Sequence, residues 1–468
     1  MHRTTPRHFR PTCSRNDGPL PSSLTPTGGG PGAARTWGLL SALAALATSP
    51  AWATNGMNME GYGPISTGMG GASQAIDHGT AALAQNPATL ALMGDTARLD
   101  VALGVLGPHV TSSMPGMGSA DSGGTSYVMP AFGYARRSGA LTYGMGLFAQ
   151  GGMGTEYGAD SFLAAGSGQP VRSELGVGRL LFPLAWQVTP ELAIGGTLDY
   201  MWASLDMRMA ASGAQLGSMV TAASGNLAAA LPALAGAPWA RIDFSNSSDF
   251  SGAAFSTGWA AKIGVVYKAT PAWTLGASYQ IESALQDMKT SAGGASMTAF
   301  GGFADTGRIT VVDFQWPATT AIGASWQATP SVLLAADVKH IAWSGVMKDF
   351  KLRYDSAGMG GSVSFALAQD WKDQTVLNLG LAWRAMPELT LRAGLNLADN
   401  PIPEALVNPL FPATVKNHAT FGLGWQFSPA NEFNGSLVVA PTTSVTNGDG
   451  VKVSHRQTSA QLMYTHRF

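Results

Sequence analysis

The sequence predicts an all-β fold, a transmembrane antiparallel β-barrel of about 14 strands, and three observations support this prediction. Charged residues make up only 12% of the chain, against about 25% in ordinary soluble domains, yet no run of about 18 apolar residues indicates a transmembrane helix. From residue 96 onward, apolar residues alternate with small or polar ones in segments of about ten residues, the length that a tilted membrane-crossing strand needs. Short turns alternate with long connections, as they do at the two rims of outer-membrane barrels.

The alternation is clear in residues 192–202. Leu192, Ile194 and Leu198 fall on one face of such a strand, and Ala193 and Thr197 fall on the other. Several similar segments carry an aromatic residue at one end of the apolar face, where lipid headgroups would lie. A soluble β-sandwich also alternates, but its strands are shorter and it gains nothing from aromatic residues at that place.

Residues 1–53 are predicted to be a signal peptide with an extended N-terminal region. The stretch WGLLSALAALATSPAWA (37–53) follows Arg35 and has an apolar core that is too short to span a bilayer. It ends in AWA (51–53), a small-x-small cleavage site. A buried helix is the alternative interpretation, and the true translation start within residues 1–34 stays open.

Residues 54–95 do not follow a strand pattern. The run TAALAQNPATL (80–90) would be helical without its Asn86-Pro87 pair. Proline lacks a backbone donor and biases the residue before it away from helix, so the chain must turn there. We therefore expect a small, kinked segment ahead of the first strand.

Residues 96–468 are predicted to form the barrel, with long loops at 151–178 and 210–254. Tight turns containing Pro190, Pro330 and Pro387 separate other strands. The predicted strands are 96–110, 127–137, 141–150, 179–188, 192–209, 255–268, 273–288, 309–328, 332–354, 375–384, 389–398, 417–427, 432–445 and 453–468.

Five stretches carry a resemblance to a known family. They are GMNMEGYGPISTGMGGASQAIDHGTAALAQNPATLALMG (56–94), WQVTPELAIGGTLDYMWASLDM (186–207), GWAAKIGVVYKATPAWTLGASY (258–279), WKDQ (371–374) and DNPIPE (399–404). In this order and spacing the chain resembles the FadL-type outer-membrane transporters of long-chain fatty acids and other hydrophobic compounds. The resemblance covers essentially the whole mature chain and implies a bacterial outer-membrane location.

The resemblance also implies roles for particular segments. Residues 54–95 would form a hatch, or plug, inside the barrel, with Asn86, Pro87 and Ala88 as its gating turn. The two long loops would capture ligand, although ordinary loop packing would also explain their apolar residues. A kink in the third strand would open the wall sideways. The glycines of that strand are the candidates for this kink, although a Gly-rich chain could simply tolerate them: Gly144, Gly146, Gly151 and Gly152.

Low charge favours a hydrophobic small-molecule cargo, because general porins line their constrictions with charged side chains. A fatty-acid cargo would need a basic partner for its carboxylate, and Arg208, Lys348 and Lys351 near the loop ends of long strands are the candidates. Solvated rim charges or interstrand pairs are the alternative interpretation of these residues. A general diffusion channel for small polar solutes is the alternative function.

Other functions find no support in the sequence. Catalytic motifs such as G-x-S-x-G, H-E-x-x-H and a P-loop are absent, and the 8 histidines have no ligand spacing, so we expect no enzyme activity, no metal and no cofactor. With no cluster of basic residues, nucleic-acid binding is not expected. The single cysteine, Cys13, would be removed with the signal peptide. We expect a monomer in outer-membrane lipid whose terminal Phe468 is read by the barrel-assembly machinery.

The cleavage site yields the first prediction. The mature protein should begin at Thr54, because cleavage follows the small residue that ends AWA. N-terminal sequencing of protein taken from outer membranes measures this directly. A chain beginning at Met1, or beyond Gly56, would contradict the prediction.

Overall fold

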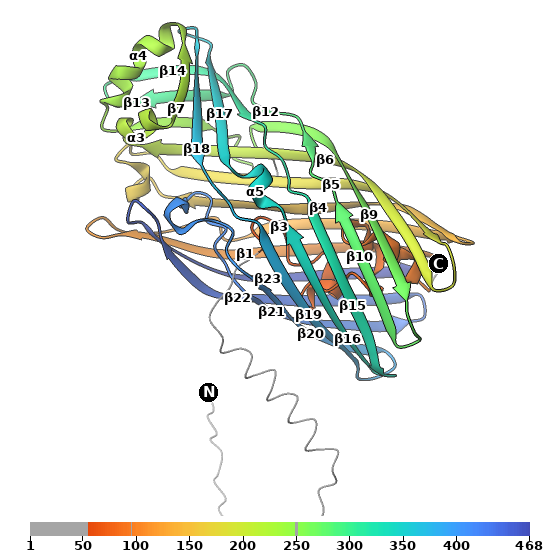
Figure 1. The fold of residues 1–468 in the computed structure, drawn as a ribbon. Coiled ribbons are helices and arrows are strands. Elements are labelled where there is room, and N and C mark those ends of the chain that lie inside the picture. Colours follow the sequence, from red (N-terminus) through yellow and green to blue (C-terminus); the bar gives the residue numbers. More distant parts are fainter. Residues whose placement is uncertain (1–54, 95, 249–250) are drawn as a thin grey trace, which may run out of the picture. The chain divides into compact units, whose positions relative to one another are not determined.

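The computed structural model describes residues 55–94, 96–248 and 251–468, and the predicted signal peptide lies outside them. The strands of the described residues form one 23-stranded sheet with antiparallel pairing. Fourteen of these strands close into a ring, because β1 (Ala97–Met114) pairs with β23 (Lys452–Arg467) from Arg98↔Arg467 to Ser113↔Lys452 (Figure 1). The predicted fold class, an antiparallel β-barrel, is confirmed.

Consecutive ring strands lie side by side, so the wall follows the order of the chain. Between β1 and β23 they are β3 (Tyr127–Ser138), β4 (Leu141–Tyr157), β5 (Val171–Gln187), β6 (Leu192–Ala211), β9 (Ala254–Lys268), β10 (Trp273–Gln280), β15 (Thr319–Thr329), β16 (Val332–Ile341), β19 (Gln374–Arg384), β20 (Leu389–Ala398), β21 (His418–Ser428) and β22 (Asn431–Thr446).

The other nine strands extend the wall at the long-loop end (Figure 1). They are β2 (Gly118–Asp121), β7 (Val220–Ser224), β8 (Ala240–Phe244), β11 (Ala284–Leu285), β12 (Met288–Lys289), β13 (Ala295–Ala299), β14 (Phe303–Val312), β17 (Asp349–Ser356) and β18 (Ser362–Ala368). Short helices accompany them: η4 (Phe162–Ala164), α3 (Gly213–Ser218), α4 (Gly225–Ala235), α5 (Trp343–Val346) and η5 (Glu404–Leu406).

These extra strands correct several predictions. The total of about fourteen is too low for the whole sheet, because strands such as β13, β14, β17 and β18 arise from connections. The predicted strand 332–354 is interrupted by α5, which follows Ile341. The predicted loop 151–178 is too long, because β4 runs to Tyr157 and β5 starts at Val171. The predicted loop 210–254 contains α3, β7, α4 and β8.

The outer face of the ring is apolar, as a lipid-facing wall requires. Alternate residues such as Leu103 on β1 and Ile263 on β9 are exposed large hydrophobic side chains. Aromatic rings collect near the short turns, where Trp273 stacks on Trp326 with centroids 5.5 Å apart. Among the described residues, no helix is long and apolar enough to cross a membrane.

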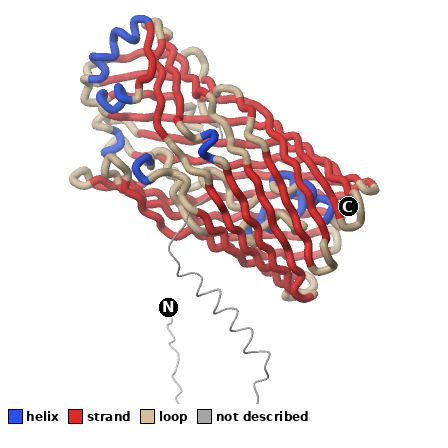
Figure 2. Tube along the Cα trace, in the orientation of Figure 1, coloured by secondary structure: helices blue, strands red, loops and turns tan. Residues whose placement is uncertain are grey.

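Residues 55–94, which we call the hatch, fill the lumen and are almost entirely buried (Figure 2). The hatch contains α2 (Gly63–Thr67), η2 (Gly79–Ala84) and η3 (Pro87–Leu92). Wall carboxylates cap its backbone: Asp337 accepts from the Ser73 and Gln74 amides at 2.6 and 3.0 Å, and Asp100 accepts from the Thr80 amide at 2.8 Å. The hatch is therefore fastened to β16 and β1, on different sides of the ring.

A buried contact between a glutamate and a histidine adds a further anchor. Glu60 of the hatch lies 3.0 Å from His418 Nε2 on β21. Burial alone would raise the pKa of Glu60, but the charge and the hydrogen bond of His418 outweigh burial, and the pKa lies below its usual value. The carboxylate is therefore the favoured form inside the lumen.

The Asn86-Pro87 turn is held by the wall, but away from the third strand. Asn86 Nδ2 donates to the Gln74 carbonyl at 2.8 Å and to the Val265 carbonyl of β9 at 3.1 Å. Its Oδ1 accepts from the Ala88 amide at 3.1 Å. The turn fits against two wall glycines: a Cβ on Gly264 would lie 2.0 Å from Asn86 Oδ1, and one on Gly195 would lie 2.7 Å from the Ala88 nitrogen. The turn therefore braces the hatch against β6 and β9.

Replacing Asn86 by Ala should loosen the hatch and spare the barrel. The change removes three buried hydrogen bonds, each worth about 0.5–1.5 kcal/mol, and leaves their partners unsatisfied. The ring satisfies its own backbone groups, so heat-resistant gel migration should persist. Hydrogen exchange in residues 55–94 should accelerate and small solutes should leak. Asn226→Ala is the matched control, because it removes one hydrogen bond, to the Met359 carbonyl, at an exposed position outside the hatch. Unchanged exchange in the Asn86 variant would contradict the role of the turn.

Candidate functional site

The candidate site begins where the ladder between β3 and β4 ends. Pairing of these strands runs from Ser138↔Leu141 to Phe132↔Leu147 and stops. Both strands continue beyond this point, β3 toward Tyr127 and β4 to Tyr157. In that part β4 pairs with β5 only, with a register shift between Ala149 and Gly151. The wall therefore splits between its second and third strands.

The first described residues of the hatch hold β4 at this split. We call Asn55–Met59 the strap. Asn58 forms an isolated bridge with Gly151, and the Gly152 amide donates to the Met57 carbonyl at 3.2 Å. A Cβ on Gly151 would lie 2.0 Å from the Met57 oxygen. Glycine at this position is thus what allows the strap to approach the backbone.

The predicted glycines of the third strand divide into two pairs. Gly151 and Gly152 lie at the split. Gly144 and Gly146 lie within the regular ladder, opposite Ala135 and Gly133. A Cβ on Gly146 would lie 2.8 Å from a methyl group of Leu83 in the hatch. These two glycines therefore leave room for neighbours and do not mark the split.

Besides its contact with β4, the strap is held by a cluster of tryptophans. Asn58 Oδ1 accepts from Gln150 Nε2 at 2.7 Å and from Trp316 Nε1 at 2.9 Å. The ring of Trp316 lies edge-on to Trp343, and Trp343 edge-on to Trp371, with centroids 5.7 and 5.0 Å apart. Gly56 packs on Trp343, where a Cβ would lie 2.8 Å from the ring. The strap thus connects β4 to this tryptophan cluster.

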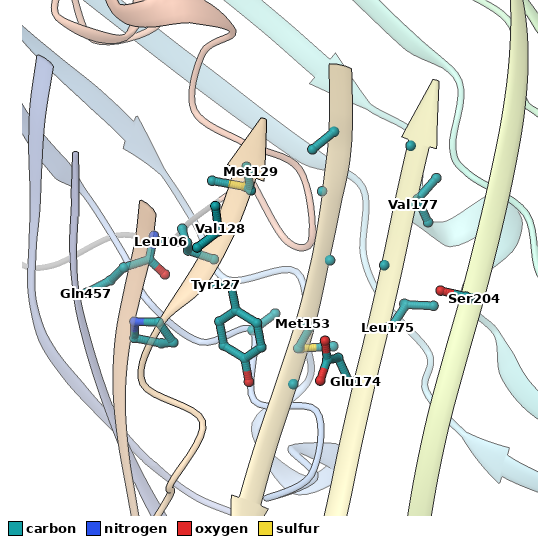
Figure 3. Close-up of a pocket in the computed structure, with 18 of the residues that line it drawn as sticks. Leu106, Tyr127, Val128, Met129, Met153, Glu174, Leu175, Val177, Ser204 and Gln457 are labelled. Carbon is teal, nitrogen blue, oxygen red and sulfur yellow. The ribbon is translucent and has the colours of Figure 1, made fainter. Parts of the chain in front are cut away.

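A cavity of about 300 Å³ lies at the split in the wall. Val128 and Leu147, which are 45% and 37% exposed on the lipid face, line it together with the buried, inward-facing Leu175 and Val177. Figure 3 shows that Met129 and Met153 also point into this space. We call it the wall cavity. Its lining comes from both faces of the wall.

A second, smaller cavity lies on the other side of the strap and is polar. It has about 40 Å³ and shares Asn58 and Gln150 with the region of the split. Its lining includes Arg179, Lys262 and Lys339. Arg179 is paired with Asp199 at 3.1 Å, with both side chains fully buried. We call it the polar chamber.

A third cavity of about 660 Å³ opens among the long loops. Both predicted capture loops line it, with Phe162 and Leu163 from the first and Met219 from the second, beside Met209 of β6. Among its described lining residues, Asp449 is the single charged one. We call it the mouth cavity.

The three predicted carboxylate anchors lie outside these cavities. Arg208 donates to the hydroxyl of Ser247 at 2.6 Å, while Lys348 and Lys351 are exposed. None of the three is among the described residues that line the wall cavity, the polar chamber or the mouth cavity. The structure does not bring them together, and their role in binding stays a prediction.

Sequence reasoning missed the strap and its tryptophans. In the structure Trp316, Trp343 and Trp371 each lie in a connection between ring strands, whereas the predicted strands 309–328 and 332–354 included the first two. Only Trp371 lay in a predicted connection, where a large apolar ring must be buried somewhere. No pattern in the sequence around these tryptophans indicates that they pack together beside the strap. Among the described residues, no group of His, Cys, Asp or Glu side chains is placed to hold a metal ion.

Solved structures resemble this chain over most of its length. The toluene transporter TodX of P. putida is 32% identical, with 88% of this chain and 99% of that chain covered and a TM-score of 0.79. The toluene transporter TbuX of Ralstonia pickettii is 30% identical, with 88% and 99% covered and a TM-score of 0.74. A FadL homologue of Pseudomonas aeruginosa, 14% identical with 90% and 100% covered, shares the fold at a TM-score of 0.68.

A curated relative matches a shorter part of the chain. It is an uncharacterized protein encoded upstream of a phosphoenolpyruvate carboxykinase gene in Chlorobium limicola, 42% identical over 79 residues. The match covers 17% of this chain and 38% of that protein. It carries no functional information.

The sequence profile of one family matches residues 40–457. That family is described as outer membrane protein transport protein (OMPP1/FadL/TodX). Together with the closed barrel and its hatch, this match shows that the chain belongs to the OMPP1/FadL/TodX family of bacterial outer-membrane transport proteins.

Proposed function

We propose that this protein takes up hydrophobic small molecules passively, capturing them in the mouth cavity and releasing them sideways through the wall cavity. The observation that carries the proposal is the wall cavity itself, which is lined by lipid-facing Val128 and Leu147 together with inward-facing Leu175 and Val177. Apolar cargo there is in contact with apolar surface on both sides of the wall. The toluene transporters among the similar structures support the same cargo class.

The mouth cavity suits the capture step. Phe162, Leu163, Met209 and Met219 offer apolar contacts, and burial of apolar surface stabilises a ligand by about 25 cal/mol per Å². Methionine adapts its shape to different ligands because its side chain is unbranched and flexible. A preference for hydrophobic compounds of several shapes follows from this lining.

The polar chamber opposes passage along the barrel axis. A hydrophobic molecule moving past the strap would meet Arg179, Lys262 and Lys339 in a space of about 40 Å³. It would have to displace the hydrogen bonds that these groups make with the hatch, such as the one from Lys262 Nζ to the Ala84 carbonyl. The sideways route avoids this cost. The general diffusion channel, our alternative, would need the buried hatch to leave the lumen.

Two further expectations remain part of the proposal. The barrel should act as a monomer in outer-membrane lipid. Phe468, whose amide donates to the Ala97 carbonyl at 2.9 Å and whose side chain is exposed, should be the signal for the assembly machinery.

Uptake without ion conductance is the direct test of this function. Because the hatch fills the lumen, reconstituted protein should show no large steady current in planar bilayers. Cells that produce it should accumulate labelled toluene faster than cells without it. Large steady conductance, or toluene uptake equal to that of the control cells, would instead favour the diffusion channel.

Gly151→Ala should close the sideways route. The added Cβ would clash with the Met57 carbonyl oxygen, 2.0 Å away, at a cost of about 1–3 kcal/mol. The strap should detach, and β4 would then be free to pair with β3. Hydrogen exchange at Gly152 should accelerate and hydrophobic uptake should fall.

Gly104→Ala is the matched control, since its nearest neighbour would be in ordinary contact at 3.4 Å. It should leave both measurements at the wild-type level. Full uptake by a folded Gly151→Ala barrel would show that the strap does not hold the wall open.

A further inference from the structure

We infer that Glu174 gives the wall cavity a charge selectivity, admitting uncharged hydrophobic molecules and rejecting carboxylates. The inference rests on the proposed function and deepens it. Glu174 is on β5, opposite Gly154 of β4, and lines the wall cavity beside Met153 (Figure 3). Among the described lining residues, the ionisable ones besides Glu174 are His455 and Tyr127.

The side chain of Glu174 lies on the outer face of the wall. Its neighbours in sequence point inward: the Ser173 hydroxyl donates to the Leu410 carbonyl of a loop in the lumen, and Leu175 is buried. Residues alternate along a strand, so Glu174 points outward. It therefore stands at the membrane side of the opening, on the face that carries Trp202 and Ser204 of β6.

The positive partner of Glu174 is not among the described residues that line the cavity. Arg172, two residues earlier on the same face, pairs with Glu174 and lies 3.7 Å from Glu156. Its guanidinium also donates to the Ser248 carbonyl at 3.0 Å. Among the described residues of this cluster, Glu174 lines the cavity, while Arg172 and Glu156 do not. A molecule in the opening therefore meets the carboxylate before the guanidinium.

This placement distinguishes cargo by charge. A hydrocarbon or an alcohol leaves the barrel without crossing an electrostatic barrier. An ionised fatty acid must carry its carboxylate past Glu174, where the surrounding protein and lipid weaken the screening of like charges. On the neighbouring strand β6, Asp206 lies opposite Glu174 and Arg208 lies opposite Arg172, and neither is among the described residues that line the cavity.

The experiment compares two ligands with the same chain, octanol and octanoate. Each is used to displace an environment-sensitive hydrophobic dye from the purified full-length protein at pH 8, where octanoate is ionised. The measured quantity is the ratio of octanoate to octanol affinity. E174Q should raise this ratio by about tenfold or more, since it removes the like charge from the opening.

Two matched variants isolate the effect. E174D keeps the charge in the opening and should keep the wild-type ratio. E156Q removes one negative charge from the same cluster outside the lining, and should change the ratio by less than about threefold. Heat-modifiable gel migration confirms that each barrel has folded.

The outcomes separate the inference from the proposed function. If octanol fails to displace the dye from the wild-type protein, the proposed function is overturned. If octanol displaces it but E174Q leaves the ratio unchanged, or E156Q matches E174Q, the charge selectivity of Glu174 is overturned and the proposed function stands.

Discussion

The contact between the strap and β4 is the interaction on which the rest of the route depends. A closed barrel pairs every strand with two neighbours, because an unpaired backbone group facing lipid costs several kcal/mol. The ladder between β3 and β4 breaks this rule after Phe132↔Leu147. The strap supplies part of the missing pairing from inside, through the Asn58↔Gly151 bridge and the Met57 carbonyl. In the proposed route the hatch both fills the lumen and holds β4 apart from β3 at the split.

The distribution of polarity then directs the cargo. The lumen around the hatch holds buried carboxylates, amides and cations, and these groups are used to fasten the hatch: Asp337 and Asp100 accept from its backbone, and Asn86 bonds to the wall. Such a network favours water and hydrogen-bonded chain over hydrocarbon. The mouth and wall cavities are lined mainly by apolar side chains. This distribution supports the proposed route, in which hydrophobic molecules leave sideways toward the membrane.

The sequence allowed prediction of the features that depend on residues close together in the chain. Alternation along each strand depends on neighbours two residues apart, so most ring strands, such as β6 and β10, were recognisable. The Asn86-Pro87 turn was recognisable for the same reason. The strands of the long-loop end were not, because β14 pairs with β17 and β18 with β7, across connections whose packing no local pattern reports. Similarly, Gly151 looks like Gly144 in sequence, but Gly144 lies in the ladder with β3, whereas Gly151 lies beyond it, where Met57 approaches.

The most direct measurement of the central claim is photolabelling with a hydrophobic diazirine cargo, followed by mass spectrometry of the labelled peptides. The account predicts adducts in the mouth cavity and at the split in the wall, on residues such as Met129, Leu147 and Val177. Adducts on the polar chamber, at residues such as Gln74 and Lys262, without any at the split would contradict it, because cargo would then cross the barrel along its axis.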